Sequence, residues 1–199
     1  EIMPSLVGSE MCIRDRGERI WSSFFQSVTT RTAGFNTADL DKMTDSGKMG
    51  MVLLMVIGGS PGSTAGGMKT TTAAVLFAMA ISVFRKNEQA HLYNRRIAEE
   101  TQRNAATIFV LYMMLFTGSA MFISYLEKVP LVTAFFETGS AIGTVGLSLG
   151  LTPTLGLASR LVLICLMFFG RVGGLTLIFA TVSGKRTEYK YPQEKINVG

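Results

Sequence analysis

The sequence is poor in the residues that support most enzyme and metal chemistry. It contains two cysteines, Cys12 and Cys165, and one histidine, His91. Two distant cysteines cannot form a disulfide framework or a zinc site, and His91 has no ligand partners at metal spacing. No nucleophile or paired-carboxylate constellation is present either, so we expect no enzyme and no bound cofactor. Charged residues make up only 17% of the chain, whereas 48% of its residues are hydrophobic.

The hydrophobic residues lie in long blocks, which indicates lipid as the solvent. The stretch from Asn104 to Leu126 has no charge and exceeds the roughly 20 residues needed to cross a bilayer. A second block, Leu161 to Gly184, is interrupted only by Arg171, and a third, Met49 to Phe84, by a glycine-rich stretch and Lys69. Three such blocks leave little amphipathic surface, so buried helices of a large soluble protein are the weaker alternative. We expect an all-α, polytopic membrane protein.

The first sixteen residues do not share this pattern. The string LVGSEMCIRDR resembles translated sequencing-adapter sequence, and its apolar run is too short for a signal peptide. We therefore expect residues 1–16 to be a non-native leader and exclude them from the fold prediction.

The net charge of +5 could indicate nucleic acid, but the placement of the basic residues follows the positive-inside rule instead. One connection and the segment after the last block are rich in Lys and Arg, whereas the connection after Leu126 carries only Lys128. These basic residues are Arg85, Lys86, Arg95, Arg96, Arg103, Lys185, Arg186, Lys190 and Lys195. The sequence therefore predicts that the connection 86–103 and the tail 185–199 lie in the cytoplasm, with no nucleic-acid partner.

Two shorter apolar segments, Ile20 to Thr30 and Leu131 to Ala141, are too short to span and are predicted to be re-entrant half-helices. Each carries a Phe-Phe pair and runs into a Thr-x-Gly loop, so the unit is repeated. Glycine tolerates positive φ, which lets such a loop turn its carbonyls inward, and a ring of carbonyls can replace a cation's hydration shell. The predicted filter residues are Thr32, Ala33, Gly34, Phe35, Thr144, Val145, Gly146 and Leu147.

The stretch MVLLMVIGGSPGSTAGGMKTTT imitates a phosphate-binding P-loop, but Met68 separates Gly67 from Lys69 and no Asp follows Asp45. A helix break at membrane depth is the better interpretation, since Pro61 and several glycines interrupt the apolar block. Whether this break also gates remains open from composition alone. Glu137, in the second half-helix, could favour cations or bond to neighbouring backbone, and the sequence does not decide between them.

The motifs TTRTAGFNT, GGSPGSTAGGMKTTT, GSAIGTVGLSLG and FFGRVGGLTL resemble the bacterial Trk/Ktr/HKT potassium transporter family, closest to its KtrB and TrkH membrane subunits. The resemblance implies four helix, pore-loop, helix units around one ion path. Residues 17–85 would then supply the pore helix, filter loop and broken second helix of the third unit, and residues 104–184 the fourth unit. Without the first two units, such a fragment should not conduct alone.

The resemblance also implies a gate beneath the filter. Its residues would be Gly58, Gly59, Ser60, Gly62, Ser63, Thr64, Gly66, Gly67, Lys69 and Arg171. Arg171 would lie by the pore and raise the barrier to cations, although a purely structural ion pair is an alternative.

Potassium uptake across the bacterial inner membrane is the implied function, with sodium dependence left open. A homodimer and a cytosolic nucleotide-binding regulatory subunit of the KtrA/TrkA type are the implied partners. The alternative function is a non-conducting, membrane-anchored structural or regulatory subunit.

Overall fold

The computed structural model describes residues 16–40, 43–86, 90–92 and 95–173 and is mostly helical. Its main elements are α2 (Arg16–Thr29), α3 (Asp45–Val56), α4 (Thr70–Phe84), α5 (Glu99–Glu127), α6 (Leu131–Ile142) and α7 (Leu157–Val172). A 3₁₀ turn, η2 (Thr152–Thr154), precedes α7. Two short strands, β1 (His91–Leu92) and β2 (Arg95–Arg96), pair antiparallel in the predicted connection, which an all-α prediction did not include.

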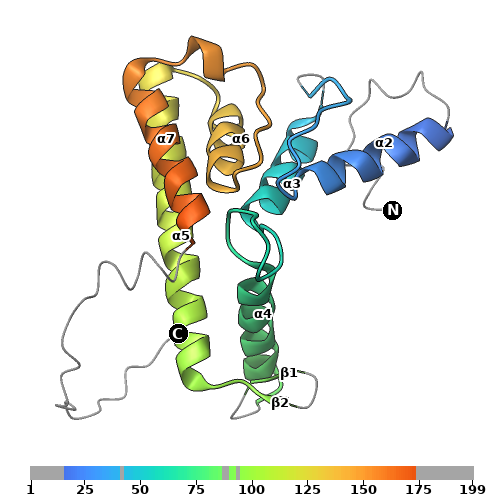
Figure 1. Cartoon of the computed structure of the whole chain (residues 1–199), viewed down its shortest axis with the longest axis vertical. Helices are drawn as coiled ribbons and strands as arrows, with labels where there is room; N and C mark the ends of the chain where they lie inside the picture. Colours follow the sequence, from blue (N-terminus) through green and yellow to red (C-terminus); the bar gives the residue numbers. More distant parts are fainter. Residues whose placement is uncertain (1–15, 41–42, 87–89, 93–94, 174–199) are drawn as a thin grey trace.

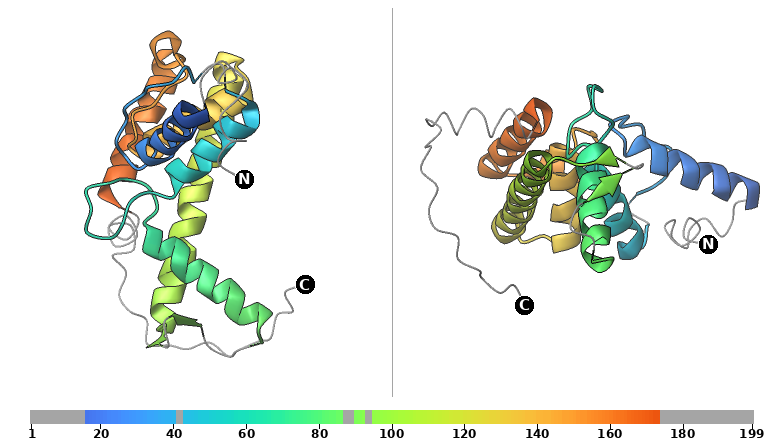
Figure 2. Two further views of the ribbon diagram at one scale, coloured as in Figure 1. Left: turned by 90° about the vertical axis from the view of Figure 1, so that its right-hand side faces the viewer. Right: turned by 90° about the horizontal axis from the view of Figure 1, so that it is seen from below.

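The 29-residue α5 is the longest element, and α7, α6 and α4 pack against it (Figure 1). An 18-residue stretch of α5 has a mean hydropathy of 1.9, and α5 is the one helix among the described residues that is long and apolar enough to cross a membrane, by length and composition. In the left view of Figure 2, α4 crosses α5 obliquely. The predicted helix over Asn104–Leu126 is present as part of α5, and that it spans a membrane stays a prediction.

Both predicted half-helices form. After α6 runs along part of α5, the chain returns to the end at which α6 began, and the loop after α2 similarly leads back to the start of α3 (Figure 1). The predicted break in the block Met49–Phe84 is also confirmed, since α3 ends at Val56 and α4 starts at Thr70. In this arrangement the short helices α2 and α6 end near the middle of the molecule, where the loop between α3 and α4 also lies.

The predicted last block, which extended to Gly184, is corrected at its end. Helix α7 ends at Val172, because Gly173 has φ 85°, which is outside the helical region. The remaining residues of that block, 174–184, and the predicted tail 185–199 lie outside the described residues, as does most of the predicted leader.

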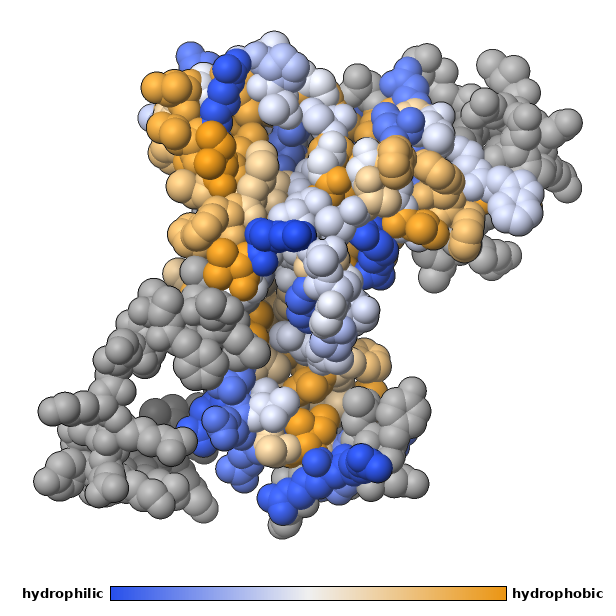
Figure 3. Space-filling model, in the orientation of Figure 1, coloured by the Kyte–Doolittle hydropathy of each residue, from blue (hydrophilic) through white to orange (hydrophobic). Residues whose placement is uncertain are grey.

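A continuous apolar core joins α3, α5, α6 and α7. The largest of its fully buried side chains are Phe136, Met55, Ile123, Ile142 and Val52. Apolar side chains also cover much of the outer surface over α7, whereas hydrophilic ones gather at the end near β1 and β2 (Figure 3). All five basic residues of the predicted cytoplasmic connection are exposed at that end.

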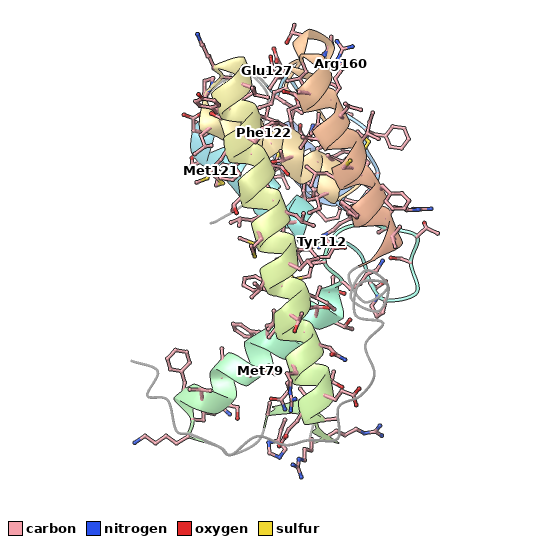
Figure 4. All side chains as sticks on the ribbon, turned by 90° about the vertical axis from the view of Figure 1, so that its left-hand side faces the viewer. Met79, Tyr112, Met121, Phe122, Glu127 and Arg160 are labelled. Atoms are coloured by element: carbon pink, nitrogen blue, oxygen red, sulfur yellow. The ribbon has the colours of Figure 1, made fainter. Side chains whose placement is uncertain are left out.

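The opposite end of α5 is joined to α7 by a carboxylate. Glu127 accepts hydrogen bonds at Oε1 from the Gly156 N–H (2.9 Å) and from Ser159 Oγ (2.6 Å), at the start of α7. Figure 4 shows Glu127 beside Arg160 at this end of the molecule and Met79, on α4, towards the other. The carboxylate satisfies a free N–H at a helix N-terminus, where the helix dipole also favours negative charge.

Candidate functional site

The two Thr-x-Gly loops have the same unusual backbone. Thr32 and Thr144 have φ values of 67° and 51°, and Gly34 and Gly146 have φ values of 73° and 89°. A β-branched residue rarely adopts positive φ, and such a conformation costs roughly 1–3 kcal/mol. Two equivalent threonines therefore carry the same strain in two repeats, and strained residues of this kind cluster at functional sites.

The backbone N–H groups of each loop turn back towards the preceding short helix. In the second copy, the Val145 N–H donates to the Ser140 carbonyl (2.9 Å) and the Gly146 N–H to Ser140 Oγ (3.1 Å). In the first copy, the Ala33 N–H donates to the Thr29 carbonyl (3.1 Å), at the position equivalent to Ser140. Within the described ranges the carbonyls of residues 144–146 make no hydrogen bond, so they are free to face a ligand.

The two loops also meet each other, although they are about 110 residues apart in the chain. Thr32 Oγ1 donates to the Gly143 carbonyl (3.4 Å). A Cβ added to Gly34 would lie 2.5 Å from the Val145 carbonyl oxygen, so no side chain fits there. The structure thus brings the predicted filter residues of both copies to one place, with a carbonyl of one loop directed at the backbone of the other.

The last residues of the two predicted filter segments differ in environment. Leu147 is buried in the apolar core, whereas 71% of the Phe35 side chain is exposed. The Phe35 carbonyl accepts a hydrogen bond from Thr29 Oγ1 (2.6 Å), which ties it to α2.

The glycine-rich loop, residues 58–67, is closed at its base by backbone hydrogen bonds. The Gly58 N–H donates to the Met68 carbonyl (2.8 Å), and the Thr70 N–H donates to the Gly59 carbonyl (3.1 Å). The two sides approach so closely that a Cβ on Gly58 would lie 1.9 Å from the Gly66 carbonyl oxygen. The loop is therefore a compact excursion with a defined neck, of the kind called an Ω-loop.

Three basic side chains donate to carbonyls of this loop or its neck. Lys69 Nζ contacts the carbonyls of Ser63 (3.2 Å) and Ala65 (2.5 Å), and the Arg171 guanidinium contacts that of Thr64. Arg31, in the first Thr-x-Gly loop, donates to the carbonyls of Ile57 and Gly58, the latter at 3.0 Å. Sequence reasoning missed Arg31, because a basic residue 27 positions from the loop carries no local signal for this contact.

The glycine-rich loop and the second Thr-x-Gly loop are directly bonded. The Gly66 N–H donates to Thr144 Oγ1 (3.0 Å), and a Cβ on Gly66 would lie 2.4 Å from the same oxygen. Within the loop, Ser63 bonds the Ser60 carbonyl, and Gly62 at the tip has φ 84° and no neighbour within 4 Å of an added Cβ. The predicted gate loop thus contacts the predicted filter at Gly66 and Thr144, while the roles of these residues remain predictions.

Glu137, whose role the sequence left open, is 4% exposed and bonds to the segment that follows the second Thr-x-Gly loop. Its partners are two hydroxyls and one backbone N–H, so the structural alternative describes its contacts.

Comparison with known proteins identifies the family. Residues 9–189 match the family model TrkH, described as a cation transport protein. The chain is 41% identical to the potassium/sodium uptake protein NtpJ of Enterococcus hirae, over 92% of this chain and 42% of that protein. It is 35% identical to the Ktr system potassium uptake protein B of Bacillus subtilis, over 92% of this chain and 41% of that protein, and 34% identical to that of Vibrio alginolyticus, over 89% and 39%.

The chain spans about two-fifths of the length of these curated relatives. The family match nevertheless covers both Thr-x-Gly loops, the glycine-rich loop and Arg171. It agrees with the expectation of a transporter rather than an enzyme. The resemblance predicted from the four motifs is confirmed, and the chain belongs to the TrkH family of cation transport proteins.

Proposed function

We propose that this chain is part of the ion-translocating subunit of a Trk/Ktr-type potassium uptake system, moving potassium down its electrochemical gradient. In this proposal it supplies the third pore loop with the helix that follows and the whole fourth unit. The observation that carries the proposal is the meeting of two equivalent loops that have the same positive-φ backbone and whose Thr-x-Gly carbonyls accept no hydrogen bond within the described part of the chain. The names of the relatives support potassium as the cargo, and sodium in the case of NtpJ.

Selection of the cation would occur at the two Thr-x-Gly loops. Because their N–H groups are bonded to the short helices, the carbonyls of residues 32–34 and 144–146 could replace the hydration shell of a cation without breaking a hydrogen bond seen among the described residues, whereas that of Phe35 is bonded to Thr29. The C-terminal end of α6 leads directly into the second loop, so the negative end of its dipole lies next to the ion. Both effects favour a cation over an anion.

Passage beyond the filter would be limited by the glycine-rich loop. Arg31, Lys69 and Arg171 all bond to neutral carbonyls there, and among the described residues no carboxylate pairs with them, so their charges would together oppose a cation. The Gly66–Thr144 hydrogen bond would have to break or shift before the loop could leave its place below the filter. Opening would therefore be a movement of the loop about its neck.

The proposed setting is the bacterial inner membrane, with several spans and a homodimer. The exposed basic end formed by α4, β1, β2 and the start of α5 would face the cytoplasm, and there we place the contact with a nucleotide-binding regulatory subunit.

Replacing Arg95 and Arg96 by Glu should then weaken co-purification of that subunit while leaving the amount of membrane protein unchanged.

The test is rubidium uptake by a potassium-uptake-deficient bacterium that expresses the complete reading frame containing this chain. Gly146→Ser should weaken the preference for rubidium over sodium, because a side chain at φ 89° disturbs the carbonyl ring. Gly150→Ser is the matched control: its φ is 78°, and like Gly146 it has no neighbour within 4 Å of an added Cβ. Both substitutions carry the same backbone strain, but only one lies in the filter.

Absence of rubidium uptake at normal membrane expression would refute the proposal and favour the non-conducting subunit. Equal effects of Gly146→Ser and Gly150→Ser would refute the filter assignment. Uptake measured with and without sodium decides whether transport depends on sodium.

A further inference from the structure

The segment that follows each Thr-x-Gly loop is bonded to the short helix before it, through equivalent residues. Gln26 in α2 and Glu137 in α6 hold the same place in the repeat, and both are at least 96% buried. Gln26 Nε2 donates to Asn36 Oδ1 (3.2 Å), and Ser148 Oγ donates to Glu137 Oε1 (2.6 Å). Asn36 and Ser148 are likewise equivalent, each two residues after the loop glycine.

We propose that Glu137 is a positioning residue that fixes the filter loop 144–147 from its outer side, and that Gln26 does the same for loop 32–35. This inference rests on the proposed function, because it assigns these loops to ion selection. It concerns residues that bond to the segment directly after each loop, and not to the ion.

Both carboxylate oxygens of Glu137 accept hydrogen bonds from the segment that follows the loop. Besides Ser148, the Leu149 N–H donates to Oε1 (3.0 Å), and Thr152 Oγ1 donates to Oε2 (2.7 Å). On the inner side, Ser140 holds Val145 and Gly146. Two residues of α6 that lie one helical turn apart, Ser140 and Glu137, thus form hydrogen bonds on either side of the filter carbonyls.

Packing holds only part of this segment: Val145 and Leu147 are buried in the apolar core, whereas Ser148 and Thr152 are not. A cavity of about 330 Å³ lies against it, lined by Glu137, Ser140, Thr144, Gly146, Ser148 and Thr152, with Leu163 and Met167 of α7 among its other lining residues. Because this cavity leaves the Ser148 and Thr152 side of the segment without close packing, we infer that the hydrogen bonds to Glu137 hold that side. Loss of the carboxyl group would let the segment relax towards the cavity and change the spacing of the carbonyls.

The contacts of Glu137 argue against direct coordination of the ion. Each of its oxygens already accepts a short hydrogen bond, and its partners in the described part of the chain are neutral. To coordinate a cation it would have to release the loop. Its negative charge still favours cations nearby, so a test must separate charge from hydrogen bonding.

The two copies of the repeat differ in how many hydrogen bonds hold the segment after the loop. Gln26 makes one hydrogen bond to Asn36, whose Oδ1 also accepts from the Ala38 N–H (3.2 Å), and Gln26 Oε1 is buried without a partner among the described residues. Glu137 makes three. We therefore expect the fourth-unit loop to depend more on its anchor than the third-unit loop.

The experiment compares Glu137→Ala and Glu137→Gln with a matched control, Glu127→Ala, in the full-length protein. Gln retains an acceptor for Ser148 and Leu149 but no charge. Glu127 makes similar bonds, to the Gly156 N–H and Ser159 Oγ, but it joins α5 to α7 away from the loops. The readouts are the KM and maximal rate of rubidium uptake, the rubidium-over-sodium preference, and the stabilisation of the purified protein by potassium relative to sodium.

Glu137→Ala should reduce the rubidium preference by about tenfold, the equivalent of one or two net hydrogen bonds, and should raise KM more than it lowers the maximal rate. It should also abolish the extra stabilisation by potassium. Glu137→Gln should have a rubidium preference and a stabilisation by potassium close to those of the unmodified protein. Glu127→Ala should lower the unfolding temperature without changing selectivity. Gln26→Ala should reduce selectivity less than Glu137→Ala.

Unchanged selectivity in Glu137→Ala would overturn the inference, and so would a Glu137→Gln variant as defective as Glu137→Ala, since charge would then be the cause. If the unmodified protein takes up no rubidium but is stabilised specifically by potassium, the proposed function fails and the positioning role is decided by the stabilisation of the variants. If it shows neither property, both proposals fail.

Discussion

Gly170 lies where α7 contacts the end of α6, and its replacement by Ala is the most direct test of the packing beneath the filter. An added Cβ would lie 2.0 Å from the Ile142 carbonyl oxygen and 2.9 Å from its carbonyl carbon, whereas ordinary contacts begin at 3.4 Å. The obstacle is backbone, so it cannot move aside as a side chain would. Gly118, in α5, is the matched control, because it too lies inside a helix but has nothing within 4 Å of an added Cβ.

Replacing a helical Gly by Ala gains about 1 kcal/mol of helix propensity at either position. Overpacking costs about 1–3 kcal/mol, and we expect the upper part of that range at Gly170 because backbone blocks the way. Gly170→Ala should therefore destabilise the protein by about 1–2 kcal/mol, whereas Gly118→Ala should be neutral or stabilising.

The assay is thermal unfolding of the purified protein in detergent, with rubidium and sodium uptake measured in parallel. Ile142 directly precedes the loop at Gly143 and Thr144, so Gly170→Ala should also weaken rubidium preference, and Gly118→Ala should not. Equal unfolding temperatures for the two variants would refute the packing argument. Destabilisation without any change in selectivity would refute the link to the filter.

Three further predictions concern contacts between the loops. Gly34→Ala combines a φ of 73° with a Cβ 2.5 Å from the Val145 carbonyl oxygen, and should lower stability by about 2–4 kcal/mol in thermal unfolding. Gly66→Ala should be destabilising because its Cβ meets the Thr144 side chain, and Thr144→Ala should restore part of the loss in a double-mutant cycle. Arg31→Gln should raise the initial rate of rubidium uptake about fivefold, since losing about 1 kcal/mol of bonding at the neck favours the displaced loop.

Distinct outcomes would contradict these predictions. Wild-type stability of Gly34→Ala would mean that the two loops do not approach as described. Strict additivity of Gly66→Ala and Thr144→Ala would show that the two residues do not interact. A slower or unchanged uptake by Arg31→Gln, at equal expression, would exclude a restraining role for Arg31.

Hydropathy and chain-breaking residues were sufficient to predict most of the elements. The uncharged run Asn104–Leu126 became the centre of α5, and the segment Leu131–Ala141 became α6 to within one residue. The glycine-rich stretch broke its helix as predicted, because Pro and Gly act on the backbone locally. The same local signals missed the end of α7 at Gly173 and the small β1–β2 pair, where a single glycine and a two-residue ladder carry little pattern.

The sequence located the two Thr-x-Gly loops of the proposed site but not the contacts between them, and the roles of their residues stay predictions. The repetition of Thr-x-Gly after a short apolar segment was enough to locate both loops, because the repeat can be recognised in the amino-acid sequence without a structure. The positive φ of Thr32 and Thr144 was not predictable, because β-branched residues disfavour that conformation and surrounding structure must impose it. The role of Arg31 at the neck of the glycine-rich loop was equally invisible.

The sequence by itself determined which segments are apolar, which are helical, where the helices break and which pieces repeat, because those properties depend on neighbours within a few residues. Only the tertiary structure decided that Thr32 meets Gly143, that Gly66 meets Thr144 and that Arg171 meets Thr64. Each of those pairs is separated by at least 78 residues. Such contacts are set by the packing of α3, α5 and α7 around α6, where the shared burial of apolar side chains brings distant backbone groups within bonding distance.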